Sequence, residues 1–109
     1  MWDTNNSDNE PPAAELAPYS IVIWFTGSAF NGVTGPGTAG AAALGSFLDD
    51  GRSLFLSSQD YFYAKGLTSF MTSYLGVASV NGDVGQTTVT GAGTVFSGYG
   101  PYTLSYPFA

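Results

Sequence analysis

The sequence predicts a three-layer α/β fold with a mostly parallel sheet and a C-terminal antiparallel hairpin. Two apolar runs, residues 19–25 and 52–57, each precede a segment with helical character, which gives the order strand, helix, strand, helix. The first run has no polar alternation, which is typical of a strand covered on both faces of a parallel sheet. The chain has 109 residues, so we expect a single domain.

The first half of the chain is predicted to form a loop, a strand and a helix. Residues 1–18 are polar, acidic and interrupted by prolines, so they are assigned to a loop with a short helical turn at 13–16. The strand at 19–25 is followed by a flexible connection, residues 27–37, which contains four glycines. A helix over 38–50 follows, with Thr38 as its N-cap and an apolar face of Leu44, Phe47 and Leu48.

Glycines mark the helix boundaries in this region. Gly51 is expected to end the helix in a left-handed conformation. Gly40 and Gly45 either weaken that helix or let it lie close to a sheet.

The second half is predicted to add a strand at 52–57, a helix that starts near Asp60 and is closed by Gly76, and a third parallel strand at 77–80. The helix has the strongest periodicity of the chain, carried by Leu67, Phe70, Met71, Tyr74 and Leu75. Residues 87–90 and 94–96 flank Gly91-Ala92-Gly93 and predict a β-hairpin, and an edge strand is expected near Tyr102–Tyr106. The chain thus divides into an acidic loop (1–18), a βαβαβ core (19–80) and a hairpin with an aromatic tail (84–109).

Composition excludes several classes of function. Two basic residues against eight acidic ones give a net charge of −6, which argues against nucleic acid and anionic membranes as partners. The longest apolar run is strand-sized, so membrane insertion is not expected. The chain contains no Cys and no His, which removes thiolate nucleophiles, the usual general base and the commonest metal ligands. We therefore expect no cofactor.

A family resemblance lies in the order of four segments: YSIVIWFTG, a Gly/Ala-rich helix ending in LDDG, RSLFLSSQD, and a helix closing in YLG. Together they resemble a flavodoxin-like domain, and more narrowly the class I glutamine amidotransferase-like superfamily. The similar branch is the divergent one found as accessory modules of large exported bacterial proteins, including secreted peptidases. The resemblance covers about residues 1 to 80 and implies a non-catalytic structural or interaction module.

The chain departs from that family at two places. The family's nucleophile elbow carries Cys, whereas this sequence has Ser57-Ser58-Gln59 and no His, so amidotransferase chemistry is not expected. The family also opens with a strand and a helix that are missing here, and residues 1–4 resemble the end of its second strand. The missing unit would leave an edge and a face of residues 19–25 uncovered, which predicts self-association, marginal stability or docking to neighbouring domains of a parent protein.

An extracellular or cell-surface location is expected from the low charge, the scarcity of Lys and the abundance of Gly, Ser, Thr and Tyr. The chain shows no signal peptide, because Met1 leads directly into a polar, acidic run.

A degenerate serine hydrolase is one alternative function. Ser57 or Ser58 could act as a nucleophile on a strand-to-helix turn, with Lys65 as the base that a missing His would otherwise supply. The favoured interpretation is structural: these serines bind backbone groups at a strand end and cap the following helix.

A weak cation site is conceivable in the N-terminal loop, where Asp3, Asn5, Asp8 and Glu10 offer oxygen ligands and Asn6 belongs to an alternative set. The pattern fails as a calcium loop, since Asp8 stands where Gly is needed and Ala14 where Glu is needed. A solvated acidic loop is the favoured interpretation, so no metal is assigned.

Ligand binding is considered at two places. The glycine-rich connection could hold an anion at the carboxyl edge of the sheet, with Thr26, Gly27, Gln59 and Asp60 nearby, although its spacing matches no phosphate loop. Tyr102 and Tyr106 could stack on sugars or bind a peptide, or dock against a neighbouring domain. The remaining aromatics Trp24, Phe55, Phe70 and Tyr74 are expected in the core.

Overall fold

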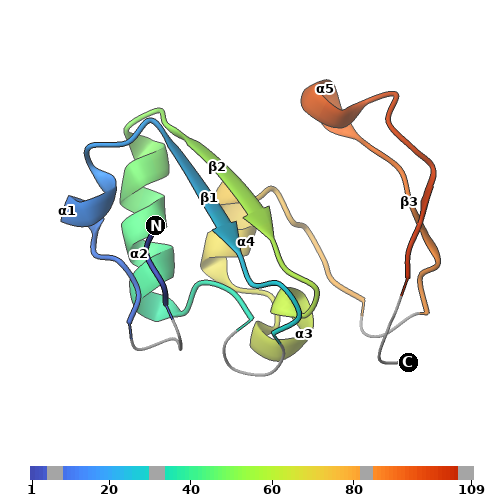
Figure 1. Ribbon diagram of the computed structural model, residues 1–109, viewed down its shortest axis with the longest axis horizontal. Helices are drawn as coiled ribbons and strands as arrows, with labels where there is room; N and C mark the ends of the chain where they lie inside the picture. The colour runs from blue at the N-terminus through green and yellow to red at the C-terminus, as the bar shows by residue number, and fades with distance from the viewer. Residues whose placement is uncertain (5–8, 30–33, 82–84, 106–109) are drawn as a thin grey trace.

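The computed structural model describes residues 1–4, 9–29, 34–81 and 85–105. The described residues up to Asn81 form an α/β body, and residues 85–105 form a C-terminal arm that stands apart from it (Figure 1). The body contains α1 (Ala13–Leu16), β1 (Ile21–Phe25), α2 (Thr38–Asp49), β2 (Ser53–Ser57), α3 (Tyr61–Lys65) and α4 (Ser69–Tyr74). The arm contains β3 (Thr88–Val89), α5 (Gly93–Phe96) and β4 (Tyr102–Thr103).

The centre of the body is a parallel pair of strands joined through α2. β1 and β2 run in register from Ile21 opposite Ser53 to Phe25 opposite Ser57. The predicted α/β class and the strand, helix, strand order are therefore confirmed, as is the short helix at 13–16. Within the described residues the parallel sheet has two strands, so the structure shows the α/β class and not the finer three-layer flavodoxin-like architecture.

The core lies on one face of this sheet, against α2 and α4. Trp24 of β1 packs with Phe47 of α2 and Phe70 of α4, and Leu44 is fully buried among them. Burial of side chains this large stabilises a fold by about 1.5–3 kcal/mol each. The expected core positions of Trp24 and Phe70 are thus confirmed, whereas Phe55 and Tyr74 are exposed.

The other face of the sheet is open, so the prediction that residues 19–25 are buried on both faces is wrong, whereas the expectation that one face of this segment is left uncovered is confirmed. Ile21, Ile23 and Phe25 are 60%, 66% and 63% exposed. The reason is the small number of elements: α2 and α4 lie on the same side of the strands, and no described helix covers the opposite side (Figure 1).

The N-terminus of α2 differs from the prediction. Gly37, and not Thr38, is the N-cap, and it has no side chain with which to cap the helix. The C-terminal prediction is confirmed, since Gly51 has φ +76° just beyond the helix. Gly40 and Gly45 permit close packing against the Glu10 carboxylate and the Tyr74 ring, respectively, and not against a sheet.

The single helix predicted from Asp60 to the residue before Gly76 is divided into α3 and α4. Gly66 interrupts it with φ +65° and ψ −170°, a backbone conformation that is essentially restricted to glycine. Thr68 then begins the second helix, where its Oγ1 accepts a hydrogen bond of 3.3 Å from the Met71 amide.

Two strand predictions in the last third of the chain are wrong. Residues 77–80 do not join the sheet, and residues 93–96 form α5 instead of the second strand of a hairpin. β3 pairs with β4, with Thr88 opposite Thr103 and Val89 opposite Tyr102. The antiparallel pair is thus present, but the predicted edge strand at 102–106 supplies its partner and does not extend the parallel sheet.

Candidate functional site

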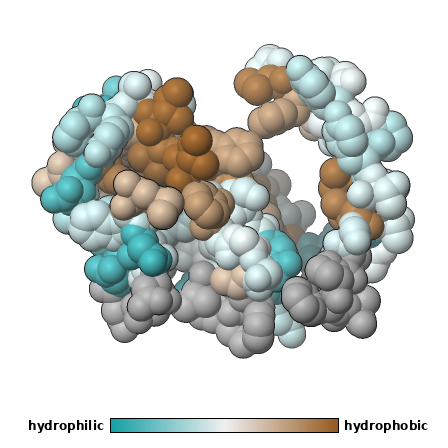
Figure 2. All heavy atoms as spheres, viewed as in Figure 1, coloured by the Kyte–Doolittle hydropathy of each residue, from teal (hydrophilic) through white to brown (hydrophobic). Residues whose placement is uncertain are grey.

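The most distinctive surface of the body is the uncovered side of the sheet, which we call the outer face. It consists of Ile21, Ile23 and Phe25 from β1 and Ser53, Phe55 and Ser57 from β2, all exposed. Alternation along each strand places these side chains opposite to Val22, Trp24, Leu54 and Leu56. Hydrophobic side chains gather visibly over the two strands (Figure 2). A contiguous apolar patch of this kind is typical of a protein-binding surface.

A groove of about 670 Å³ runs along the side of β1 that faces away from β2. We call it the edge groove. It is lined by residues of the N-terminal segment, α1 and β1: Met1, Trp2, Asp3, Thr4, Pro11, Glu15, Leu16, Tyr19, Val22, Ile23, Trp24 and Phe25. Because Ile23 and Phe25 belong to both features, the groove and the outer face form one continuous surface.

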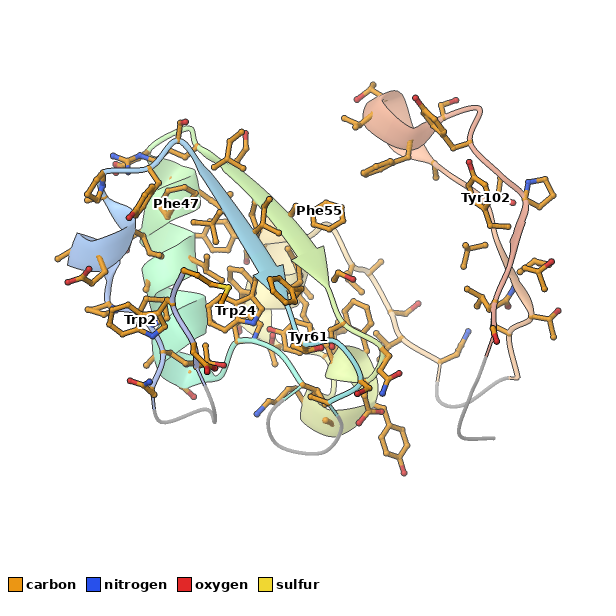
Figure 3. All side chains as sticks on the ribbon, in the orientation of Figure 1. Trp2, Trp24, Phe47, Phe55, Tyr61 and Tyr102 are labelled. Carbon is orange, nitrogen blue, oxygen red and sulfur yellow. The ribbon has the colours of Figure 1, made fainter. Side chains whose placement is uncertain are left out.

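The N-terminal wall of the edge groove is held by two side-chain hydrogen bonds. Trp2 Nε1 donates to the Asn9 carbonyl at 2.7 Å, and Asn9 Nδ2 donates to the Asp3 carbonyl at 2.9 Å. Trp2 and Trp24 both lie on the α2 side of β1, whereas Phe55 projects from the far side of β2 (Figure 3). Four of the residues that line the groove are aromatic: Trp2, Tyr19, Trp24 and Phe25.

The carboxyl edge of the sheet brings together several of the predicted ligand residues. Gln59 Nε2 donates to the Ser28 carbonyl at 3.0 Å, and the Thr26 amide donates to the Ser57 carbonyl at 3.1 Å. Thr26 Oγ1 is buried there without a hydrogen-bond partner among the described residues. Gly27 turns the chain with φ +56°. These contacts fasten the start of the glycine-rich connection to β2, which is a structural use of the residues.

The serine candidates are not arranged as activated nucleophiles. Ser58 Oγ donates its proton to the Thr34 carbonyl, which cannot act as a general base. Ser57 lies on the outer face beside Phe25. Lys65, at the end of α3, lines a separate cavity of about 260 Å³ together with Gly37 and Thr38. Asp60 serves as the N-cap residue of α3.

The N-terminus of α2, where an anion site was considered, is occupied by the chain itself. Glu10 Oε1 accepts from the Gly37 amide and Oε2 from the Gly40 amide, each at 2.6 Å. A Cβ on residue 40 would lie 2.7 Å from the Glu10 carboxyl carbon, so a larger residue there would displace the carboxylate from the helix amides. The carboxylate neutralises the positive end of the helix dipole and supplies the cap that Gly37 lacks.

Tyr61 packs beside the Glu10 carboxylate, whose negative charge affects the pKa of Tyr61. Burial, and secondly the negative charge of Glu10, raise the pKa of Tyr61 to about 12, with a hydrogen bond to Thr68 acting in the opposite direction. Its ring also fills the space next to Gly35, where a Cβ would lie 2.4 Å from the ring.

The N-terminal cation site receives no support from the geometry. Asn5, Asn6 and Asp8 lie outside the described residues. Of the other two candidates, Glu10 binds the helix amides and Asp3 lines the edge groove. Over residues 1–4, 9–29, 34–81 and 85–105, no cluster of three or more acidic side chains could hold a metal ion.

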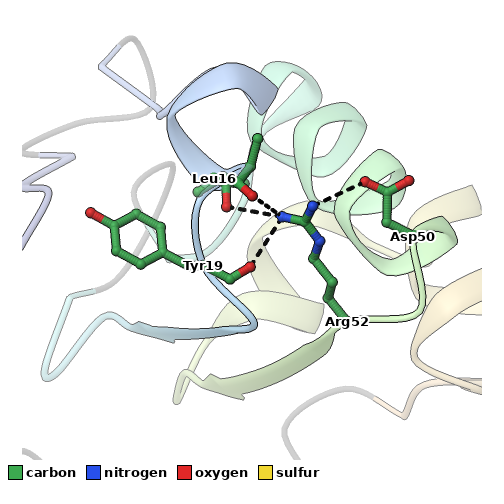
Figure 4. A network of polar contacts seen from close by, with 5 residues as sticks. Leu16, Tyr19, Asp50 and Arg52 are labelled. Carbon is green, nitrogen blue, oxygen red and sulfur yellow. Dashed lines mark hydrogen bonds and ion pairs between the residues drawn. The ribbon is translucent and has the colours of Figure 1, made fainter.

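Arg52 joins the start of β2 to the corner between α1 and β1 (Figure 4). Its Nη1 donates to the carbonyls of Leu16, Ala17 and Tyr19, its Nη2 lies 3.5 Å from Asp50, and its guanidinium lies over the Phe47 ring. One of the two basic side chains of the chain is therefore committed to holding the fold.

The tyrosine candidates of the C-terminus lie away from the body. Tyr102 is exposed on β4, and Tyr99 is exposed just before that strand. Figure 3 shows Tyr102 on the arm, apart from the labelled rings of the body. Tyr106 lies outside the described residues.

Compared with known proteins, the chain matches no protein-family model, no curated protein and no solved structure. Among the helices that the structure describes, none has the length and apolar character required to cross a bilayer.

Proposed function

We propose that this chain is a non-catalytic interaction module that docks through the outer face of its two-stranded sheet. The observation that carries the proposal is the exposure of Ile23 and Phe25, each more than 60% open to solvent at the centre and end of β1. Apolar side chains in that position favour contact with another protein surface, because each square ångström of apolar area removed from water stabilises the contact.

The charge distribution around the outer face supports an apolar partner. Neither residues 19–29 nor residues 53–59 contain a charged side chain, although the whole chain carries a net charge of −6. An uncharged docking surface avoids the desolvation of unpaired charges when a partner covers it. The neighbouring edge groove adds a concave region in which a large side chain of the partner can be anchored.

A non-catalytic role is supported by the residues at the carboxyl edge of the sheet. Ser58 donates to a carbonyl and Gln59 fastens the glycine-rich connection, so both side chains serve the fold. The amidotransferase-like, flavodoxin-like ancestry and the exported bacterial setting belong to the same proposal. They are supported by the order of the strand and helix segments and by the low charge of the sequence.

Site-specific photocrosslinking tests the proposal. A benzophenone amino acid replaces Phe25 on the outer face or, as a matched control, Ala42 on the exposed side of α2. We expect crosslinks to protein from position 25 and far fewer from position 42, with the products identified by mass spectrometry. Equal yields from both positions, or none from position 25, would refute docking through the outer face.

A carbohydrate- or peptide-binding role is the second proposal, favoured by the exposure of Tyr99 and Tyr102 on the arm. Exposed tyrosine rings can stack on sugars and donate hydrogen bonds to them. A glycan array compares the natural chain with the Tyr102→Ala variant. A hit that disappears in this variant supports the role, whereas an array without Tyr102-dependent hits argues against it.

A further inference from the structure

Among the described residues, the C-terminal arm leaves its large apolar side chains exposed instead of packing them on the body. Its two strands are held by hydrogen bonds inside the arm, from the Gly91 amide to the Tyr99 carbonyl at 2.8 Å and from the Leu104 amide to the Thr87 carbonyl at 2.9 Å. Its large apolar side chains are nevertheless exposed: Val89, Val95, Phe96, Tyr99 and Tyr102. A two-stranded pair of this size is marginal in water unless something covers its apolar side.

The arm and the outer face have complementary chemistry. Residues 85–105 contain no Asp, Glu, Lys or Arg, and neither do the two strands that form the outer face. Hydrophobic side chains are visible on the arm as well as over β1 and β2 (Figure 2). The arm and the outer face can be buried together without leaving a charge unpaired, even though each copy of the chain carries −6. The acidic side chains that line the edge groove, Asp3 and Glu15, belong to the N-terminal segment and α1 and not to β1.

We infer that the arm of one copy of this chain docks on the outer face and edge groove of a second copy. Phe96 at the end of α5 is the proposed anchor, and the edge groove beside Ile23 and Phe25 is the place that receives it. This inference rests on the proposed function, since it names the partner of the same surface. One copy contributes its arm to the contact, and the other copy contributes its outer face and edge groove. Because these two surfaces differ, the contact is heterologous and can continue from copy to copy as a ring or filament.

Two variants, each with a new charged side chain, separate the contribution of the arm from that of the outer face. Ile23→Glu disables the outer face and leaves the arm intact, while Phe96→Glu disables the arm and leaves the outer face intact. Ala42→Glu in α2 and Thr94→Glu in α5 add the same charge at exposed positions of the body and arm, and serve as controls. Circular dichroism verifies that each variant retains the helix content of the natural chain, and Tyr102→Glu replaces Phe96→Glu if the latter does not.

Sedimentation velocity over a range of concentrations measures how strongly each variant associates and how large its assemblies are. We expect the natural chain and both controls to form species larger than dimers as concentration rises, and each charge-insertion variant to associate at least about tenfold more weakly. An equimolar mixture of Ile23→Glu and Phe96→Glu should form dimers and nothing larger, because one intact arm and one intact outer face remain.

Three outcomes would overturn the inference. A natural chain that stays monomeric at every concentration has no such contact, including the case in which the arm folds onto its own body. A Phe96→Glu variant that associates as strongly as the natural chain indicates an isologous contact between two outer faces, in which the arm takes no part. Crosslinks from position 25 that lead only to a different protein would leave the proposed function intact while refuting the second copy as partner.

Discussion

At the scale of single residues, Glu10 has the clearest structural task in the chain. Its carboxylate bridges the amides of Gly37 and Gly40, and thereby joins the N-terminal segment to the start of the longest helix. A sequence pattern cannot reveal this contact, because residues 10 and 37 are far apart and an acidic loop normally faces solvent. The only local hint was the absence of a capping side chain at Gly37.

Replacement of Glu10 by Gln should destabilise the fold by about 1–2 kcal/mol, since a charge-assisted cap at a helix N-terminus is lost and an amide group must face the helix amides. Chemical denaturation at neutral pH measures the change in the free energy of unfolding. Glu15→Gln, at an exposed position of α1, is the matched control and should change stability by no more than about 0.5 kcal/mol. Equal losses of stability in the two variants would contradict the role of Glu10 as the cap of α2.

Tyr61 gives the fold a dependence on alkaline pH. The phenol ionises near 10 in an unfolded chain, but burial and the charge of Glu10 raise its pKa to about 12 in the folded protein. The contribution of Tyr61 to the free energy of unfolding is therefore fully present below pH 10. It is lost as the pH rises toward 12, because the phenol of the unfolded chain releases its proton first. We expect a loss on the order of 2–3 kcal/mol over this window.

Denaturation curves of the natural chain and of Tyr61→Phe, recorded on both sides of pH 10, test this dependence. The variant should lose most of the slope of stability against pH. Tyr74 acts in the same direction, since its hydrogen bond to Asp49 also raises its pKa. An unchanged slope in Tyr61→Phe would show that Tyr61 is not the group responsible.

At the scale of elements, local patterns located most of the body correctly. The spacing of apolar residues predicted strands at 19–25 and 52–57 and a helix at 38–50, and the structure has them at 21–25, 53–57 and 38–49. Hydrophobic periodicity and glycine termination are local signals, so they predict helices and strands without knowledge of the tertiary fold.

Long-range arrangements were the part that sequence patterns could not supply. An uninterrupted apolar run predicts burial on two faces only if enough other elements exist to cover both, and the described residues provide helices for one. The partner of β3 was likewise misassigned, because pairing at residue 102 instead of 94 depends on the whole arm. An uncovered face of residues 19–25 was expected from the missing first unit, whereas the exposure of Phe55 beside it was not, because Phe55 was assigned to the core.

The break between α3 and α4 gives a test at this scale. Gly66→Ala should cost about 1–3 kcal/mol, because an alanine at φ +65° and ψ −170° is strained. Ser73→Ala, at an exposed position of α4, is the control and should be nearly neutral. A neutral Gly66→Ala with increased helicity in circular dichroism would mean that the two helices can join into the single helix that periodicity predicts.

At the scale of the whole molecule, the arm sets the dimensions. The radius of gyration is 14.4 Å, compared with about 13 Å for a compact domain of this length. The chain extends over 39 × 30 × 26 Å, and the long axis runs from the body to the arm (Figure 1). The body therefore has a buried core, whereas the described side chains of the arm are almost entirely exposed.

Hydrogen exchange should report this division and its dependence on concentration. In dilute solution the amides of residues 85–105 are expected to exchange close to their intrinsic rates, while those of α2 and β2 are protected by the core. In concentrated solution the arm and the amides of β1 should gain protection together, because the arm of one copy covers the outer face of another. Ile23→Glu should abolish the gain at both places, and Ala42→Glu should leave it unchanged. Protection of the arm that is already complete in dilute solution would mean that it packs on its own body.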